Sequence, residues 1–253
     1  QVFERKSLRA AILRERGRDF QEEGAVRQAI AMYTRTLHFN PEDIVALVSR
    51  GRAYNSAGDY DKAIEDSTKA ISIDGEHAAA WRNRGYSYDE KGEVDKAIEN
   101  YDEAIRLDPE YAPAWLNRGY SYDEKGELDK AIGNYDEAIR LDPEYALAWN
   151  GRGICYSEKH EFDRAIENYD EAIRLKPEYV LAWYHRGICY GEENDHDEAI
   201  KNYDEAIRLK PKNAFAWYGR GYSFFKTDEL DKAIKDCGEA IRLDPEYADP
   251  WHV

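Results

Sequence analysis

The residues of this sequence that could bind a metal ion are its six histidines and three cysteines. His185 and Cys189 stand four positions apart, so both would lie on one face of a helix, as paired metal ligands do. No third histidine or cysteine follows at a metal-binding spacing. Cys155 precedes Cys189 by 34 positions and Cys237 replaces a recurring tyrosine, so we interpret all three as small packing residues. We expect neither a metal ion nor another cofactor.

Carboxylates are abundant, and two of them close together can act as acid and base in catalysis. The adjacent pairs Asp89-Glu90 and Asp123-Glu124, however, occupy the same place 34 positions apart, which favours solvated helix ends. The glycines form no phosphate-binding loop, and no nucleophile is paired with a base. The sequence therefore predicts a protein that is not an enzyme.

Arginine recurs at the same 34-residue spacing and could form a strip that binds anions. The set comprises Arg16, Arg50, Arg84, Arg118, Arg152, Arg186 and Arg220. A structural alternative is that these arginines pair with aspartates of the same period, such as Asp102, Asp136, Asp170 and Asp204. A spacing shared by all repeats favours the structural role, although the sequence leaves anion binding open.

Tryptophan marks the period that orders all these residues. It stands at positions 81, 115, 149, 183, 217 and 251, and Leu13 and Leu47 continue the series backwards. A fixed period of this length indicates a stack of structural repeats in which each repeat packs on its neighbours. We expect an N-terminal extension or lead-in helix in 1–9, the start of a truncated repeat in 248–253, and seven full repeats between them: 10–43, 44–77, 78–111, 112–145, 146–179, 180–213 and 214–247.

Each repeat has the pattern of two antiparallel helices. In 78–111, apolar residues follow helical spacing up to Tyr88 and again from Val94, and Gly92 between them suits a left-handed turn. Pro109 cannot continue the second helix, which we expect Asp95 to cap at its start. In the last three repeats the turn glycine is replaced by His160, Asn194 and Asp228.

The succession of Trp81, Gly85, Tyr88, Gly92, Ala97, Tyr101, Ala104 and Pro109 resembles the tetratricopeptide repeat (TPR). The resemblance covers almost everything from residue 10 onward. It implies an all-α, right-handed superhelical solenoid in which the first helix of each repeat lines a concave groove. It also implies a protein–protein interaction scaffold or adaptor that binds a peptide, a helix or a protein surface in that groove.

In this family the residues just after the tryptophan site and just after the glycine commonly face the groove. The first series comprises Arg14, Val48, Arg82, Leu116, Asn150, Tyr184 and Tyr218, and the second Arg18, Arg52, Tyr86, Tyr120, Ile154, Ile188 and Tyr222. Asn83 and Asn117 stand where the family can grip a peptide backbone. An alternative is that several of these side chains pack against the next repeat instead.

Both series change from arginine to aromatic and apolar residues along the chain. We therefore expect a protein or peptide ligand with an acidic segment at the N-terminal end and apolar side chains at the other. The net charge of −16 argues against nucleic-acid binding, and no apolar run is long enough for membrane insertion.

Two other functions stay open at this point. The chain could self-associate through the ends of the array, or serve as the regulatory or substrate-recruiting arm of a larger enzyme. Three cysteines without a disulfide framework fit a reducing, intracellular compartment, so we expect a cytoplasmic location.

Overall fold

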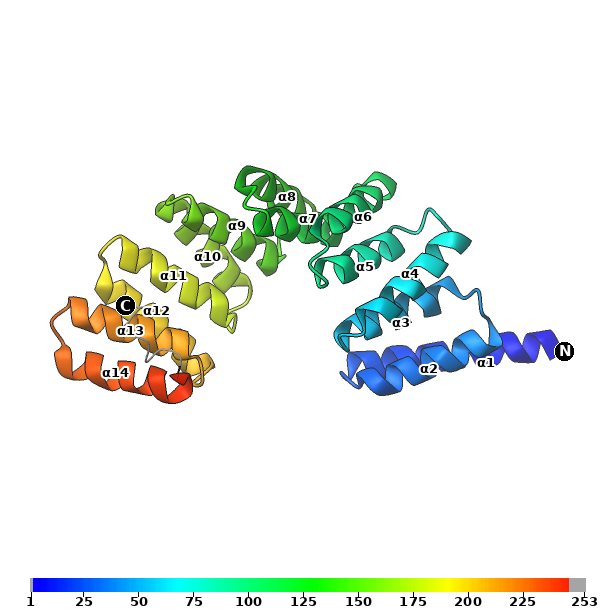
Figure 1. Cartoon of the computed structure of the whole chain (residues 1–253), viewed down its shortest axis with the longest axis horizontal. Helices are drawn as coiled ribbons and strands as arrows, with labels where there is room; N and C mark the ends of the chain where they lie inside the picture. Colours follow the sequence, from blue (N-terminus) through cyan, green and yellow to red (C-terminus); the bar gives the residue numbers. More distant parts are fainter. Residues whose placement is uncertain (1, 246–253) are drawn as a thin grey trace. The chain divides into compact units, whose positions relative to one another are not determined.

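The structure is a computed structural model that describes the backbone of residues 2–245 and the side chains of residues 8–245. The described residues form fourteen α-helices and no strand (Figure 1). They divide into two compact bodies, an N-terminal body that ends at Glu127 and a C-terminal body that begins at Leu128. The expected truncated repeat in 248–253 lies outside the described residues, whereas residues 2–9 belong to the first helix.

The N-terminal body contains seven helices: α1 (Val2–Glu22), α2 (Val26–Phe39), α3 (Ile44–Ser56), α4 (Tyr60–Ile73), α5 (Ala78–Asp89), α6 (Val94–Leu107) and α7 (Ala112–Glu124). The C-terminal body contains seven more: α8 (Leu128–Leu141), α9 (Ala146–Glu158), α10 (Phe162–Leu175), α11 (Val180–Glu192), α12 (His196–Leu209), α13 (Ala214–Lys226) and α14 (Leu230–Leu243). The two helices of a repeat contact each other within a body, and successive pairs stack (Figure 1).

The turn between the two helices of a repeat uses a left-handed residue. Gly92 has a φ of +73°, and Gly24, Gly58 and Gly126 adopt the same conformation. His160, Asn194 and Asp228 do so with φ values of 58°, 63° and 63°, so the substitution of glycine leaves the turn unchanged. Since α6 ends at Leu107, two residues before Pro109, the predicted helix end is also confirmed.

Small and large side chains fit together between the helices of each repeat. Tyr101 is fully buried against Gly85, where an added Cβ would lie 2.7 Å from its ring. Ala97 and Ala104 are also fully buried, so the two helix backbones approach closely at these positions. The same arrangement recurs at Gly153 with Tyr169 and at Gly187 with Tyr203.

Tryptophan fastens each repeat to the loop before it. The indole Nε1 of Trp115 donates a hydrogen bond of 2.9 Å to the carbonyl of Pro109. Trp81, Trp149, Trp183 and Trp217 make the same bond to the carbonyl six residues earlier. The period of 34 residues is thus a repeated structural contact.

The prediction that Asp95 caps the second helix of its repeat is wrong. The N-cap of α6 is Glu93, and it makes no side-chain capping bond. Asp95 instead pairs with Lys125 of the next repeat at 2.7 Å. The same contact joins Asp61 to Lys91 and Asp129 to Lys159, so this carboxylate connects repeats.

Candidate functional site

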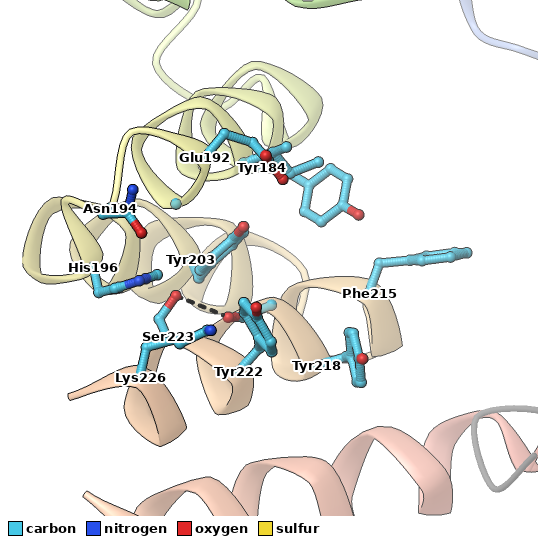
Figure 2. A pocket seen from close by; sticks show the side chains of 13 residues that line it. Tyr184, Glu192, Asn194, His196, Tyr203, Phe215, Tyr218, Tyr222, Ser223 and Lys226 are labelled. Carbon is cyan, nitrogen blue, oxygen red and sulfur yellow. Dashed lines mark hydrogen bonds between the residues drawn. The ribbon is translucent and has the colours of Figure 1, made fainter. Parts of the chain in front are cut away.

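The C-terminal body has a hollow of about 290 Å³ that opens between the first helices of two successive repeats (Figure 2). Side chains of α11 and α13 form two of its walls, and α12 supplies residues behind them. Tyr184, Ile188, Tyr218 and Tyr222, all expected to face a groove, line this one space. The structure therefore brings together the whole aromatic and apolar end of the two series.

Aromatic rings form one side of the hollow. The ring centroids of Tyr184 and Phe215 lie 6.3 Å apart, and Phe215 is 57% exposed. Tyr184 and Tyr218 are half-buried, whereas Tyr222 is 44% exposed. Rings that are fixed at their base and open to solvent on one face can bury large apolar area at little cost in conformational entropy.

The other side of the hollow is polar, and its residues were not predicted. It comprises Glu192, Asn194, His196, Ser223 and Lys226. The ring of His196 meets that of Tyr222 edge-on at 6.4 Å, and the ammonium of Lys226 lies 5.2 Å from the centroid of the same tyrosine ring. The signal available in the sequence was the position of these residues, at the end of α11, in the turn after it, at the start of α12 and on the last turns of α13.

The cationic residues expected at the N-terminal end already have partners, with one exception. Arg14 forms a two-pronged ion pair with Asp43, with contacts of 3.2 and 3.0 Å. Arg18 pairs with Glu15 at 2.5 Å and with Glu22 at 3.8 Å. Arg82 donates to Asn117 at 3.1 Å. Arg52 is exposed and forms no ion pair within residues 2–245.

Four of the expected groove residues are buried, as the packing alternative requires. Leu116 is 3% exposed, and Asn83, Asn117 and Asn150 are 3%, 6% and 2% exposed. Asn83 donates to the carbonyl of Val48 at 3.1 Å, so its amide joins two first helices of the stack. These four side chains therefore belong to the packing between repeats.

Three further expected residues, Tyr86, Tyr120 and Ile154, are half-buried. Burial, together with a hydrogen bond to Glu90, raises the pKa of Tyr86 to about 12. The guanidinium of Arg82 lies 5.7 Å from the centroid of the same ring. Tyr86 is therefore held in place by its own chain.

Four members of the arginine ladder have structural partners. Arg118, Arg152, Arg186 and Arg220 pair with Asp102, Asp136, Asp170 and Asp204, as the sequence favoured. Each guanidinium also stacks on the tryptophan three residues earlier, at 4.7 Å from the ring centroid. Arg84 donates to Asn100 at 2.8 Å, as Arg152 and Arg186 donate to the equivalent asparagines. It departs from the pattern because Thr68, at 3.3 Å, stands in place of the aspartate, and burial lowers its pKa.

His185 and Cys189 are packing residues in this structure. His185 stacks on Tyr169 with centroids 5.9 Å apart and meets Tyr184 edge-on at 5.3 Å. Burial lowers the pKa of His185 to about 4. The Cys189 thiol donates to the hydroxyl of Ser157 at 3.5 Å. Among the described side chains, those of residues 8–245, no group of three or more metal-ligand side chains is placed to hold an ion.

Family models identify the repeat. The model described as tetratricopeptide repeat matches residues 146–179, 180–213 and 214–247, and a second model with this description matches 44–77. A model described as TPR repeat matches 85–126 and 119–159. The chain is a tetratricopeptide repeat protein. The comparison with curated protein sequences found no match.

Solved TPR structures share its fold. The crystal structure of MamA superimposes with a TM-score of 0.60 at 28% identity, over 65% of this chain and 96% of that one. A tetratricopeptide repeat protein from Parabacteroides merdae has a TM-score of 0.68 at 20% identity, over 94% of both chains. YrrB, described as a TPR protein with an unusual peptide-binding site, has a TM-score of 0.56 at 21% identity, over 73% of this chain and 95% of that one.

The TPR protein thus has the fold of interaction scaffolds, and the all-α solenoid class is confirmed. None of the described helices combines the length and the apolar character that crossing a membrane requires.

Proposed function

We propose that this TPR protein binds a peptide segment of a partner protein in the hollow between α11 and α13. The observation that carries the proposal is the cluster of Tyr184, Phe215, Tyr218 and Tyr222 around one open space. Clusters of aromatic side chains in a concavity contribute most of the binding energy in many protein interfaces. The peptide-binding site named for YrrB supports the same use of the fold.

The test uses peptides selected from a random 12-residue phage library on the wild-type protein. Their dissociation constants are then measured by fluorescence anisotropy for Tyr184→Ala and Tyr218→Ala. Each substitution removes a central aromatic contact, so we expect binding to weaken by more than about tenfold. Tyr190→Ala is the matched control, because Tyr190 lies on the same helix α11 and does not line the hollow.

Two results would count against this function. Peptides whose affinity is unchanged by both substitutions, with the helical circular dichroism signal intact, bind elsewhere. A loss that Tyr190→Ala reproduces reflects damage to α11 instead of a lost contact.

A finer proposal concerns the N-terminal body, where an acidic stretch of the partner would contact Arg52. Its exposed guanidinium lies on α3, which packs against α5, the helix of Arg82. Arg52→Glu should weaken binding of an acidic peptide at low salt and reduce its salt dependence. Arg18 already pairs with two glutamates, so Arg18→Glu should change the affinity and its salt dependence less. Equal effects of both substitutions would point to overall charge.

Self-association is the second candidate function, and one surface favours it. A hollow of about 370 Å³ on α13 and α14 is lined by Phe225, Ile234 and Ile241, and Ile234 is 73% exposed. Light scattering of the wild type and of Ile234→Glu at several concentrations tests the proposal. A concentration-dependent rise in mass that Ile234→Glu abolishes supports it, and a constant monomer mass for the wild type refutes it.

A further inference from the structure

A short chain of polar contacts runs from repeat to repeat beside the tyrosines of the second helices. The hydroxyl of Ser87 donates to Asn55 at 2.7 Å, and that of Ser121 donates to Asp89 at 2.9 Å. In the C-terminal body the Cys189 thiol donates to Ser157 at 3.5 Å. Each contact joins one side chain near the end of a first helix to a small polar side chain on the next first helix.

In the N-terminal body, polar residues of this chain also form hydrogen bonds with the hydroxyl of a buried tyrosine, Tyr101. The Tyr101 hydroxyl lies 3.4 Å from Asp89, to which it donates, and it accepts from the amide of Asn117 at 3.4 Å. Asp89 therefore receives hydrogen bonds from two hydroxyls, those of Ser121 and Tyr101. The side chains of the repeat itself fill this space.

In the C-terminal body, glycine replaces both of the polar residues that contact the buried tyrosine in the N-terminal body. Gly191 and Gly219 stand at the positions of Asp89 and Asn117, next to Tyr203 at the position of Tyr101. Tyr203 is 5% exposed, and its hydroxyl makes no hydrogen bond within the part of the chain that the structure describes. Ser223, at the position of Ser121, donates only to the carbonyl of Gly219, at 3.1 Å.

These four residues, the two glycines with Tyr203 and Ser223, all line the hollow of the proposed binding site (Figure 2). A Cβ added at Gly191 would meet no atom within 4 Å, so there is room beside it. The side chain of Tyr203 is nearly buried, but its hydroxyl keeps contact with the solvent of the hollow, where a ligand can replace water as its partner. The gap therefore has the form of a subsite for a polar group.

We propose that this gap, which we call the Tyr203 subsite, binds the carboxamide of an Asn or Gln side chain of the peptide. This inference rests on the proposed function, because it assigns one position of the ligand bound in the same hollow. The carboxamide oxygen takes the place of the Asp89 carboxylate and accepts from the Tyr203 hydroxyl. Its NH₂ group can donate to Glu192, which lines the same hollow. The place of the Asn117 side chain is taken by the Tyr203 ring itself, which a Cβ added at Gly219 would meet at 2.7 Å.

A neutral amide suits the subsite better than a carboxylate for two reasons. Glu192 lines the same hollow and would repel a second negative charge, although Lys226 lines its far side. In the equivalent space of the N-terminal body, burial raises the pKa of Asp89 to about 6, so a charged carboxylate is disfavoured there even with two donors.

The test compares two variants on the library-selected peptides. Tyr203→Phe removes only the hydroxyl, and Gly191→Asp supplies the chain's own acceptor, which would reach Tyr203 and Ser223 and close the subsite. Gly238→Asp is the matched control, since Gly238 also lies within a helix with no atom within 4 Å of an added Cβ. For each peptide, its Asn or Gln is replaced by Asp or Glu and, separately, by norleucine.

Each peptide replacement should weaken binding to the wild type by about tenfold. The same replacements should weaken binding to Tyr203→Phe by less than about twofold. Gly191→Asp should weaken the parent peptides by about tenfold, whereas Gly238→Asp should leave them unchanged. An amide preference that persists in Tyr203→Phe, or a preference for Asp or Glu, overturns the subsite while leaving the proposed function standing. Peptides insensitive to Tyr184→Ala and Tyr218→Ala overturn the function and the subsite together.

Discussion

His185 makes the C-terminal body sensitive to acid. Its ring stacks on Tyr169 and meets Tyr184 edge-on, and burial lowers its pKa from 6.5 to about 4. In the unfolded chain the imidazole takes up its proton near pH 6.5, so the unfolded state binds more protons between pH 6.5 and 4. The stabilisation from neutral His185 is therefore present above pH 6.5 and is lost as the pH falls through this window.

The size of the effect follows from the two pKa values. At 1.36 kcal/mol per pKa unit, the free energy of unfolding should fall by about 2 kcal/mol between pH 7 and pH 5, and by about 3 kcal/mol in total by pH 4. His185→Gln cannot take up this proton. The stability difference between the wild type and His185→Gln should therefore change by about 2 kcal/mol between pH 7 and pH 5.

Urea unfolding followed by tryptophan fluorescence at pH 7, 6 and 5 measures this difference. Acidic residues elsewhere titrate in both proteins and cancel in the comparison. Parallel pH profiles for the wild type and His185→Gln would refute the reasoning.

The remaining predictions concern packing and one buried acid. Gly153→Ala places a Cβ 2.7 Å from the Tyr169 ring and should lower the free energy of unfolding in urea by about 1–3 kcal/mol. The Cβ of Gly238→Ala meets no atom within 4 Å, so this variant should be more stable by about 0.5–1 kcal/mol. Equal effects of the two substitutions would contradict the close contact between Gly153 and Tyr169. Burial raises the pKa of Asp89 from 3.8 to about 6, so the folded protein binds this proton more tightly than the unfolded chain. The free energy of unfolding therefore falls as the pH rises from 3.8 to 6. Asp89→Asn should therefore gain stability relative to the wild type on going from pH 4 to pH 7.5, by up to about 2 kcal/mol after solvent screening is allowed for; a thermal melt series showing no gain would contradict this.

The sequence was sufficient to predict contacts that every repeat shares. The left-handed turn at Gly92 and the pairing of Arg118 with Asp102 both follow from residue types at one period. Such contacts repeat because the same geometry recurs in each layer. The fold class was predictable for the same reason.

Contacts that depend on the exact direction of a side chain were not predictable. Asp95 stands at a position typical of a cap, yet its carboxylate reaches Lys125 in the next repeat. Asn83 was expected to face a ligand, but its amide donates a hydrogen bond to the carbonyl of Val48. A period assigns a residue to a helix face only coarsely, and neighbouring repeats compete with solvent for that face.

Part of the lining of the hollow could be predicted from the sequence. The aromatic residues of α11 and α13 could be found from the two series, since each follows a fixed position of the repeat. The gap beside Tyr203 could not, because Gly191 and Gly219 have meaning only in comparison with Asp89 and Asn117, whose contacts with Tyr101 the structure shows.

The central claim is that the hollow between α11 and α13 binds peptide. The most direct measurement is the dissociation constant of a library-selected peptide for the wild type, Tyr184→Ala, Tyr218→Ala and Tyr190→Ala. The account predicts that binding weakens more than about tenfold for the first two substitutions and changes less than about twofold for the third. Equal affinity for all four proteins would contradict it.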